Sequence, residues 1–174
     1  MGGQSFELEY RPKTFGEFYG NESMKKALET DIMRKKTHLF YGPRGCGKTT
    51  LARICAKMVG CQSRYIKEYD TAVMGLKDSA RQIVQECEIV PHKGNLAYIL
   101  DEPQDASDGF MGAMLKTLEN PPSRTWFFLC TTNPEKLRIT SLSRCSQHEV
   151  GPLDRKTSIT LMRDILKKEG RPIL

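Results

Sequence analysis

The chain of 174 residues has the length of about one domain, and its 39% hydrophobic and 28% charged residues are ordinary for a globular protein. The formal net charge of +6 permits an anionic partner such as nucleic acid but does not require one. No apolar run approaches the ~20 residues of a membrane span, and no secretory signal is visible. We therefore expect a cytoplasmic protein rather than a membrane or secreted one.

Six cysteines are distributed along the chain, and none of them forms a C-x-x-C pair. Four ligands at zinc-finger spacing are missing, which argues against a zinc site. We expect reduced thiols that serve as small core residues.

The N-terminal segment predicts a loop followed by a helix. Residues 5–20 show no clear period, and Pro12 with two glycines favours an ordered loop laid over the domain. Asn21 is placed to cap a helix whose apolar positions recur at helical spacing: Met24, Ala27, Leu28 and Ile32. An apolar run at 38–41 then predicts the first strand.

A glycine-rich loop joins this strand to a helix that we expect to run from Lys48 to about Val59. The loop has the spacing G-x-x-x-x-G-K-[ST] of a phosphate-binding loop. Its glycines let successive backbone N–H groups point at phosphate oxygens, and the helix start adds the positive end of its dipole. Lys48 is placed to reach the β- and γ-phosphates of ATP, and the Thr49 hydroxyl is placed to ligate Mg²⁺. The residues expected to contact the nucleotide here are Gly42, Pro43, Gly45, Cys46, Gly47, Lys48, Thr49 and Thr50.

An alternative for this loop is a glycine-rich turn with a chance lysine. The flanks disfavour it, because strand, loop and helix follow one another in the order that the motif requires.

Strands and helices alternate after the loop. The run at 65–69 predicts a second strand, and Asp78 or Ser79 is placed to open a helix. Residues 91–95 predict a turn, and the continuous apolar run at 96–100 predicts a strand buried on both faces.

The same alternation continues to the C-terminal end. Ser107 or Asp108 is placed to cap a helix that a pair of prolines stops, and 125–130 predicts another buried strand. A short strand is expected at 147–150 and a last helix from near Asp154. The pattern predicts an α/β fold with three αβα layers and a mainly parallel, five-stranded sheet.

Two acids, Asp101 and Glu102, follow the strand predicted at 96–100. In a parallel α/β fold the carboxyl ends of the strands face the ligand crevice, so both carboxylates are expected to face the phosphate-binding loop. Asp101 is placed to hold Mg²⁺ beside Thr49, through water, and Glu102 to orient and polarise a water for attack on the γ-phosphate. The alternative is a pair of solvated carboxylates at a strand end.

Asn133 and Arg144 are two further candidates. An amide at Asn133 is suited to bond both the attacking water and a γ-phosphate oxygen, and the alternative is a turn residue before Pro134. Arg144 is a permanently charged donor fork suited to phosphate. Spacing alone leaves open whether it reaches its own nucleotide, a neighbour's, or only solvent.

Several strings in the chain resemble those of sliding-clamp loader motor subunits of the AAA+ class, in particular the bacterial polymerase III tau/gamma type from a bacterium or phage. They occur in order: Glu9-Tyr10-Arg11-Pro12-Lys13-Thr14-Phe15, the loop 42–49, Asp101-Glu102, 114–122, Thr131-Thr132-Asn133-Pro134 and Leu142-Ser143-Arg144-Cys145. The resemblance covers about residues 7–170. Its most specific part is the S-R-C triplet after T-T-N, which separates clamp loaders from most other AAA+ ATPases.

The resemblance implies a P-loop ATPase that uses ATP and Mg²⁺ to open a sliding clamp and load it on primed DNA during replication. Lys48 and Glu102 would be catalytic, together with Asn133 as the first sensor residue. Arg144 would be an arginine finger that acts on ATP held by the next subunit of a ring. Tyr10, Arg11 and Pro12 would lie against the adenine or ribose.

The resemblance also implies partners. These would be the other clamp-loader subunits, the sliding clamp and primer–template DNA, in the cytoplasm of a bacterial or phage-infected cell. The helix that holds Arg81 and the helix start at Ser107 would contact the DNA backbone.

Two departures from that family pattern matter. The four-cysteine zinc module of the bacterial type has no counterpart here, so we expect no zinc. Residues 1–152 would form the nucleotide-binding domain, and 153–174 would be only the start of a helical lid. We therefore expect weak ATPase activity from the isolated chain.

Two other functions remain open at this point. One is a weakly active structural subunit of the same machine, which the presence of Lys48, Asp101 and Glu102 disfavours. The other is a different AAA+ DNA-processing ATPase, such as a branch-migration helicase or a helicase loader, which lacks the S-R-C triplet.

Overall fold

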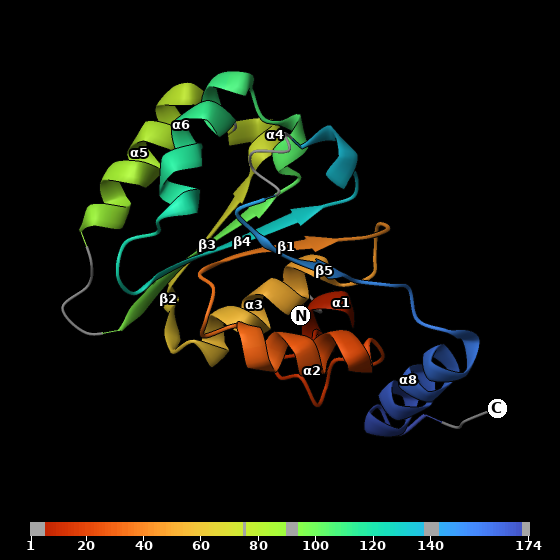
Figure 1. Ribbon diagram of the computed structural model, residues 1–174. Helices are drawn as coiled ribbons and strands as arrows, with labels where there is room; N and C mark the ends of the chain where they lie inside the picture. Colours follow the sequence, from red (N-terminus) through yellow and green to blue (C-terminus); the bar gives the residue numbers. More distant parts are fainter. Residues whose placement is uncertain (1–5, 75, 90–93, 138–142, 172–174) are drawn as a thin grey trace, which may run out of the picture.

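The structure is a computed structural model, and it describes residues 6–74, 76–89, 94–137 and 143–171. One sheet holds the strands of this part of the chain, which are β1 (Thr37–Tyr41), β2 (Cys61–Asp70), β3 (Asn95–Asp101), β4 (Thr125–Thr131) and β5 (Ser146–Glu149). Their order across the sheet is β2-β3-β4-β1-β5, and every neighbouring pair is parallel (Figure 1). The predicted parallel, five-stranded sheet is therefore confirmed.

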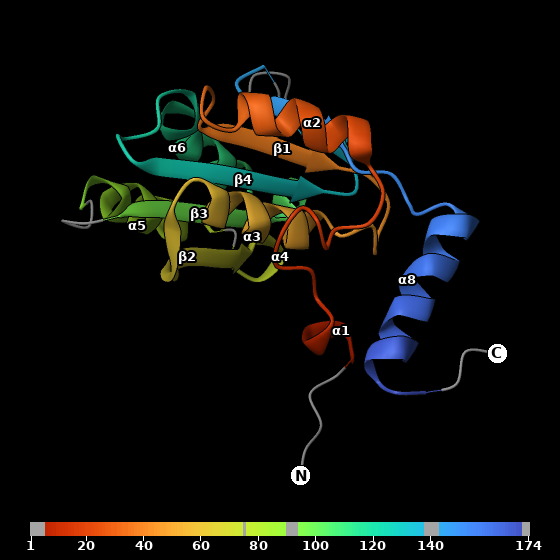
Figure 2. The same ribbon diagram turned by 90° about the horizontal axis from the view of Figure 1, so that it is seen from below.

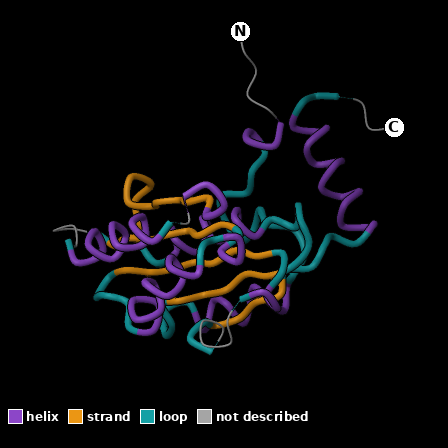
Figure 3. Tube along the Cα trace, turned by 90° about the horizontal axis from the view of Figure 1, so that it is seen from above, coloured by secondary structure: helices purple, strands orange, loops and turns teal. Residues whose placement is uncertain are grey.

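Helices cover both faces of the sheet (Figures 1 and 2). One face packs against α2 (Glu22–Asp31) and α3 (Lys48–Met58), and the other against α5 (Lys77–Glu88) and α6 (Asp108–Glu119). Figure 3 shows the second pair lying over the strands. These are the three predicted αβα layers.

The apolar run of β3 explains why two cores form. Ala97 and Ile99 belong to the core on the α3 side, whereas Leu96, Tyr98 and Leu100 belong to the core on the α5–α6 side. Successive side chains of a strand point to opposite faces, so a continuous apolar run is what a doubly covered strand requires.

The last helix, α8 (Arg155–Lys168), stands apart from the sheet beside the N-terminal segment (Figure 2). None of its residues is buried. The hydroxyl of Tyr19 donates to Asp164, and that of Tyr10 donates to Glu169, so the N-terminal segment is tied to this helix. Among the described residues, no helix is both long and apolar enough to cross a bilayer.

Several local predictions need correction. Residues 5–20 contain a short helix, α1 (Phe6–Glu9), and β2 is followed by another, α4 (Thr71–Met74), neither of which was predicted. The helix expected from Asp78 or Ser79 begins at Lys77, after Leu76 as its N-cap. Most of the turn predicted at 91–95 lies outside the described residues.

Asn21 occupies the predicted N-cap position of α2, but its side chain makes no capping bond. Instead Nδ2 donates to the Gly151 carbonyl at 3.1 Å, and Oδ1 accepts from the Gly151 N–H at 2.9 Å. The amide thus ties the start of α2 to the chain that leaves β5. By contrast, Ser107 and Asp154 are true N-caps, each accepting from the backbone N–H three residues on.

Candidate nucleotide-binding site

The glycine-rich loop connects the end of β1 to the start of α3, as predicted. Gly42, Gly45 and Gly47 have φ angles of 149°, 77° and 90°, which L side chains rarely adopt. A Cβ at Gly42 would lie 2.2 Å from the Val150 carbonyl oxygen, and one at Gly47 would lie 2.8 Å from the ring of Phe18. The loop therefore needs glycine both for its curvature and for its close packing.

Lys48 is the first residue of α3, and its side chain folds back over the loop. Its Nζ donates to the carbonyls of Gly42 and Pro43, both at 2.9 Å, and the residue is only 7% exposed. The Cys46 thiol also donates to the Pro43 carbonyl, and burial raises the pKa of this thiol. The loop is thus held closed around a nearly buried ammonium.

Thr49 and Asp101 meet across the site, from α3 and from the end of β3. The Thr49 hydroxyl lies 3.3 Å from both carboxylate oxygens of Asp101. Burial raises the pKa of Asp101, and the hydrogen bond from Thr49 opposes that rise. A hydroxyl and a carboxylate together are the hard oxygen ligands that Mg²⁺ prefers, so these two residues fit the ion.

The Glu102 side chain contacts Thr132 and Gln104 rather than Thr49. Its Oε2 accepts from the Thr132 N–H at 2.9 Å, from the Thr132 hydroxyl at 3.1 Å and from Gln104 Nε2 at 2.7 Å. Burial alone would raise the pKa of Glu102, but these hydrogen bonds lower it below its ordinary value. Glu102 is therefore held ionised and fixed in direction.

Asn133 is hydrogen-bonded to Thr132, which in turn is hydrogen-bonded to Glu102. Its Nδ2 donates to the Thr132 hydroxyl at 3.1 Å, and its N–H donates to the Thr131 hydroxyl at 3.0 Å. The structure thus brings Asn133 close to Glu102, and its contact with the attacking water and the γ-phosphate stays a prediction.

Sequence reasoning missed Gln104, Thr132 and Thr71. The Thr71 hydroxyl donates to the carbonyls of Asp101 and Glu102 at 2.8 and 2.7 Å. For Thr132 a signal was available, because β3 and β4 are parallel neighbours and polar residues just after them must meet. The sequence carried no comparable signal for Gln104 or Thr71.

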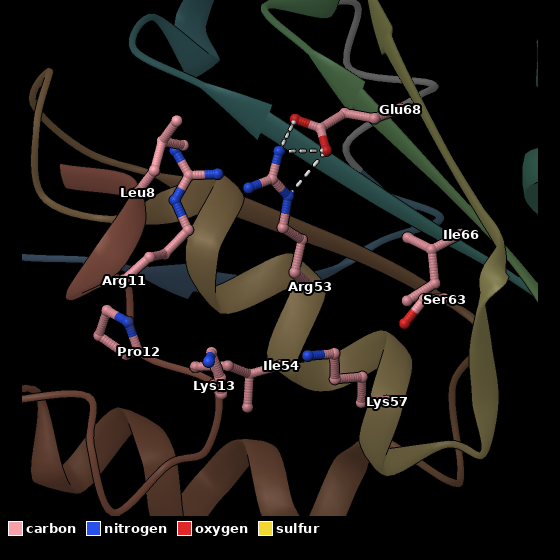
Figure 4. Close-up of a pocket in the computed structure, with 10 residues that line it drawn as sticks. All are labelled: Leu8, Arg11, Pro12, Lys13, Arg53, Ile54, Lys57, Ser63, Ile66 and Glu68. Carbon is pink, nitrogen blue, oxygen red and sulfur yellow. Dashed lines mark hydrogen bonds and ion pairs between the residues drawn. The ribbon is translucent and has the colours of Figure 1, made fainter. Parts of the chain in front are cut away.

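Arg11 and Pro12 line a cavity of about 310 Å³ between the N-terminal segment, α3 and β2 (Figure 4). Arg53 also lines it, and its guanidinium makes two hydrogen bonds to Glu68, of 2.8 and 2.7 Å. Tyr10 bonds instead to Glu169, which raises the pKa of its phenol to about 12. The lining includes no residue of the phosphate-binding loop, so the adenine contact of residues 10–12 stays a prediction.

Arg144 lies away from these groups. Its Nε pairs with Glu119, the last residue of α6, at 3.1 Å. It precedes β5, whose first residue Ser146 is in register with His38 near the start of β1, whereas the phosphate-binding loop follows the end of β1. Arg144 therefore lies near the amino ends of the strands, and Lys48 lies near their carboxyl ends.

Arg81 and Ser107 lie on the helices that cover the other face. Arg81 is in α5, its side chain is 61% exposed, and it pairs with Asp78 at 3.1 Å. Ser107 caps α6, where its hydroxyl accepts from the Phe110 N–H at 3.1 Å. Both contacts are made within the chain, so the role of Arg81 and Ser107 in binding DNA stays a prediction.

The chain is similar to known replication proteins. The model of the family described as "DNA polymerase III, delta subunit" matches residues 66–154. The DNA polymerase III tau subunit of Salmonella typhimurium is 32% identical over 97% of this chain, which spans 30% of that protein. The gamma subunit of Buchnera aphidicola subsp. Baizongia pistaciae is 31% identical over 92% of this chain, which spans 50% of it.

Solved structures of similar fold include the Thermotoga maritima RuvB Holliday junction branch migration motor. Its TM-score is 0.72 at 23% identity, covering 92% of this chain and 55% of that chain. A likeness at this identity shows the fold alone, and it agrees with the αβα layers around a parallel sheet. The family match over residues 66–154 covers half of the chain and shows that the chain belongs to the family described as "DNA polymerase III, delta subunit".

Proposed function

We propose that the chain is the ATP-binding and ATP-hydrolysing part of a clamp-loader subunit, which uses ATP to open a sliding clamp and load it on primed DNA. The observation that carries the proposal is the contact between the Thr49 hydroxyl and the Asp101 carboxylate. Lys48 precedes Thr49 in the loop, and Glu102, whose carboxylate is fixed by Thr132, follows Asp101. A purely structural subunit has no need of these four groups in one place.

The phosphate-binding loop, residues 42–50, would hold the phosphates through its N–H groups and the start of α3. The Lys48 ammonium has three donors, so phosphate oxygens can replace or supplement the carbonyls that it now contacts. Mg²⁺ held by Thr49 and Asp101 would offset the charge on the phosphates.

Glu102 would orient and polarise the attacking water. Thr132 and Gln104 hold the carboxylate in position, and Asn133 stands beside Thr132, where its amide is suited to sense the γ-phosphate. Because its pKa is lowered, Glu102 stays ionised at neutral pH and acts through its negative charge.

Arg144 would act on a neighbour's nucleotide rather than its own. Its place near the amino ends of the strands supports this, because the four residues of β5, at roughly 3.3 Å each, separate it from the carboxyl ends where Lys48 lies. Each subunit would then present its site on one side and its finger on another. Such an arrangement requires a ring or arc of subunits.

The remaining assignments follow from the same proposal. Residues 1–152 would be the nucleotide-binding domain and 153–174 the start of a lid, with α8 as its first helix. Arg81 and the start of α6 at Ser107 would face the DNA backbone, and residues 10–12 would lie against the adenine or ribose. The cytoplasm of a bacterial or phage-infected cell would be the site of action.

ATPase turnover is the measurement that tests this function. Turnover should be slow for the chain alone and should rise severalfold in a complete loader when primed DNA and a sliding clamp are added together. A branch-migration motor would respond to a four-way junction instead, and a structural subunit would show no turnover at its own site in any combination.

A further inference from the structure

A second cluster of ligand side chains lies away from the phosphate-binding loop. His38 in β1 and His148 in β5 are buried, 0% and 7% exposed, and Asp31 is the last residue of α2. One ligand atom of each of these three residues lies within 4.8 Å of the others. The cluster therefore joins three elements at the start of β1.

The two imidazoles face each other with their nitrogens. Nδ1 of His38 and Nε2 of His148 are 3.2 Å apart. Two ligands at the 2.0–2.1 Å typical of zinc–nitrogen bonds, placed at tetrahedral corners, are separated by about 3.3 Å. The observed separation is that of an N–H···N hydrogen bond and also that of two nitrogens on one tetrahedral ion, so an ion can replace the shared proton without moving the rings apart.

The surroundings fix the ring orientations. His38 Nε2 lies 3.0 Å from the Lys35 carbonyl, which can only accept, so this nitrogen carries the proton and Nδ1 presents its lone pair to His148. A ligand imidazole whose other N–H bonds a carbonyl is the usual support around a metal. Asp31 is likewise oriented, because Ser146 donates to it.

The electrostatics favour ligands rather than charged histidines. Burial lowers the pKa of both rings, and the pKa of His148 falls to about 4. His38 also stacks on Phe128, and the His148 ring lies tilted against Phe40, so both rings pack against aromatic side chains of the core.

We propose that Asp31, His38 and His148 bind a Zn²⁺ ion through two imidazole nitrogens and one carboxylate oxygen, with water as the fourth ligand. Asp31 is partly exposed, so its side leaves room for the water. The site differs from a four-cysteine zinc module in both its ligands and its place. Its effect would be to fasten the end of α2 to β1 and β5, and not to act on the nucleotide.

The experiment measures thermal unfolding of the chelator-treated, nucleotide-free chain with and without Zn²⁺. At a free zinc concentration about a hundredfold above Kd, the midpoint should rise by roughly 5–10 °C. Mg²⁺ at the same concentration should give no rise, because it prefers oxygen ligands.

Variants and spectroscopy assign the ligands. H148Q and D31N should each lose most of the zinc-dependent rise, whereas H92Q, which removes the third histidine of the sequence, should keep it. D31N changes a partly exposed side chain and so serves if H148Q does not fold. X-ray absorption at the zinc edge should show neighbours at ~2.0–2.1 Å, the distance of nitrogen and oxygen, and none at the ~2.3 Å of thiolate sulfur.

Three results would overturn the proposal. One is the absence of a zinc-dependent rise in the parent chain. Another is an equal rise in the parent and in either D31N or H148Q. The last is a sulfur neighbour at the zinc edge, which would place the ion on the cysteines. In each case the two histidines would be a hydrogen-bonded pair and nothing more.

Discussion

At the scale of single residues, Asp101 and Glu102 show how two adjacent acids acquire different environments. Asp101 ends β3 and faces Thr49, whereas Glu102 has left the strand with φ 50° and faces Thr132. A non-glycine residue at positive φ is uncommon and strained, and the bond from the Glu102 N–H to the Cys130 carbonyl, at 2.7 Å, helps to hold it. The pKa of Asp101 is raised and that of Glu102 is lowered, which fits separate roles for the two acids.

The first prediction concerns Glu102. Replacing it with glutamine keeps the shape of the side chain and removes its charge, so ATP binding should persist while hydrolysis falls by roughly 10²-fold or more. Single-turnover hydrolysis in an assembled loader measures this. Glu29→Gln, the same change at an exposed acid of α2, is the matched control and should leave the rate unchanged. A Glu102→Gln variant that hydrolyses at the parent rate would remove Glu102 from the proposed mechanism.

The second prediction concerns Lys48. One charged contact in a partly desolvated pocket contributes about 1.5–3 kcal/mol, so Lys48→Ala should weaken ATP binding by roughly tenfold or more. Titration with a fluorescent nucleotide measures the affinity, and Lys26→Ala, on the exposed side of α2, should leave it unchanged. Equal affinities for parent and Lys48→Ala would contradict the assignment of this loop.

At the scale of elements, the sequence predicted strongly patterned segments and missed contacts between distant ones. The apolar run at 96–100 and the cap at Ser107 gave β3 and α6, because burial on both faces and capping leave local signals. Four-residue helices such as α1 are too short to show a period. The Gln104 and Thr132 contacts of Glu102 depend on how strands, turn and loop meet in space, which no local pattern records.

Asn21 carries the third prediction, because it joins the start of α2 to the exit of β5. Asn21→Ala removes both bonds to Gly151 and leaves a Cβ residue at φ 56°, so it should reduce the free energy of unfolding by about 1–3 kcal/mol. Asn21→Gly also loses the bonds but accepts the positive φ, so its loss should be smaller. Urea denaturation measures both values. A glycine variant less stable than the alanine variant would show that the backbone account is wrong.

The fourth prediction concerns the ion pair between Lys67 of β2 and Glu86 of α5. The hydrogen bond from Lys67 lowers the pKa of Glu86 below its ordinary value of 4.5. A lowered carboxyl pKa gives stability that is present above the ordinary pKa and is lost as the pH falls through the folded-state pKa. Both side chains are about a third exposed, so the contribution should be only about 0.2–1 kcal/mol.

Comparing the unfolding of the parent and Glu86→Gln over a range of pH checks this. The difference in stability should be constant near neutral pH and should shrink toward zero in acid. A difference that grows as the pH falls would reverse the sign and contradict the ion-pair account.

At the scale of the whole molecule, Arg144 lies apart from the other residues of the proposed site. The phosphate-binding loop, Asp101 and Glu102 lie at the carboxyl ends of the strands. Arg144 lies near the amino ends, beside Glu119. The chain also spans only 30% of the Salmonella tau subunit, so assembly and clamp loading belong to the proposal. A finger supplied by a neighbour is worth about 10³–10⁵ in rate, because it stabilises charge that appears only in the transition state.

The most direct test of this account mixes two inactive variants in assembled loaders. Arg144→Ala keeps its nucleotide site but donates no finger, whereas Lys48→Ala donates a finger but has a damaged site. Mixed assemblies contain interfaces where an intact site meets an intact finger, so their ATPase rate should exceed the sum of the two variants measured alone. If mixed assemblies form, as shown by size and by differential tagging, and the rate does not rise above that sum, then Arg144 does not act between subunits and the account is contradicted.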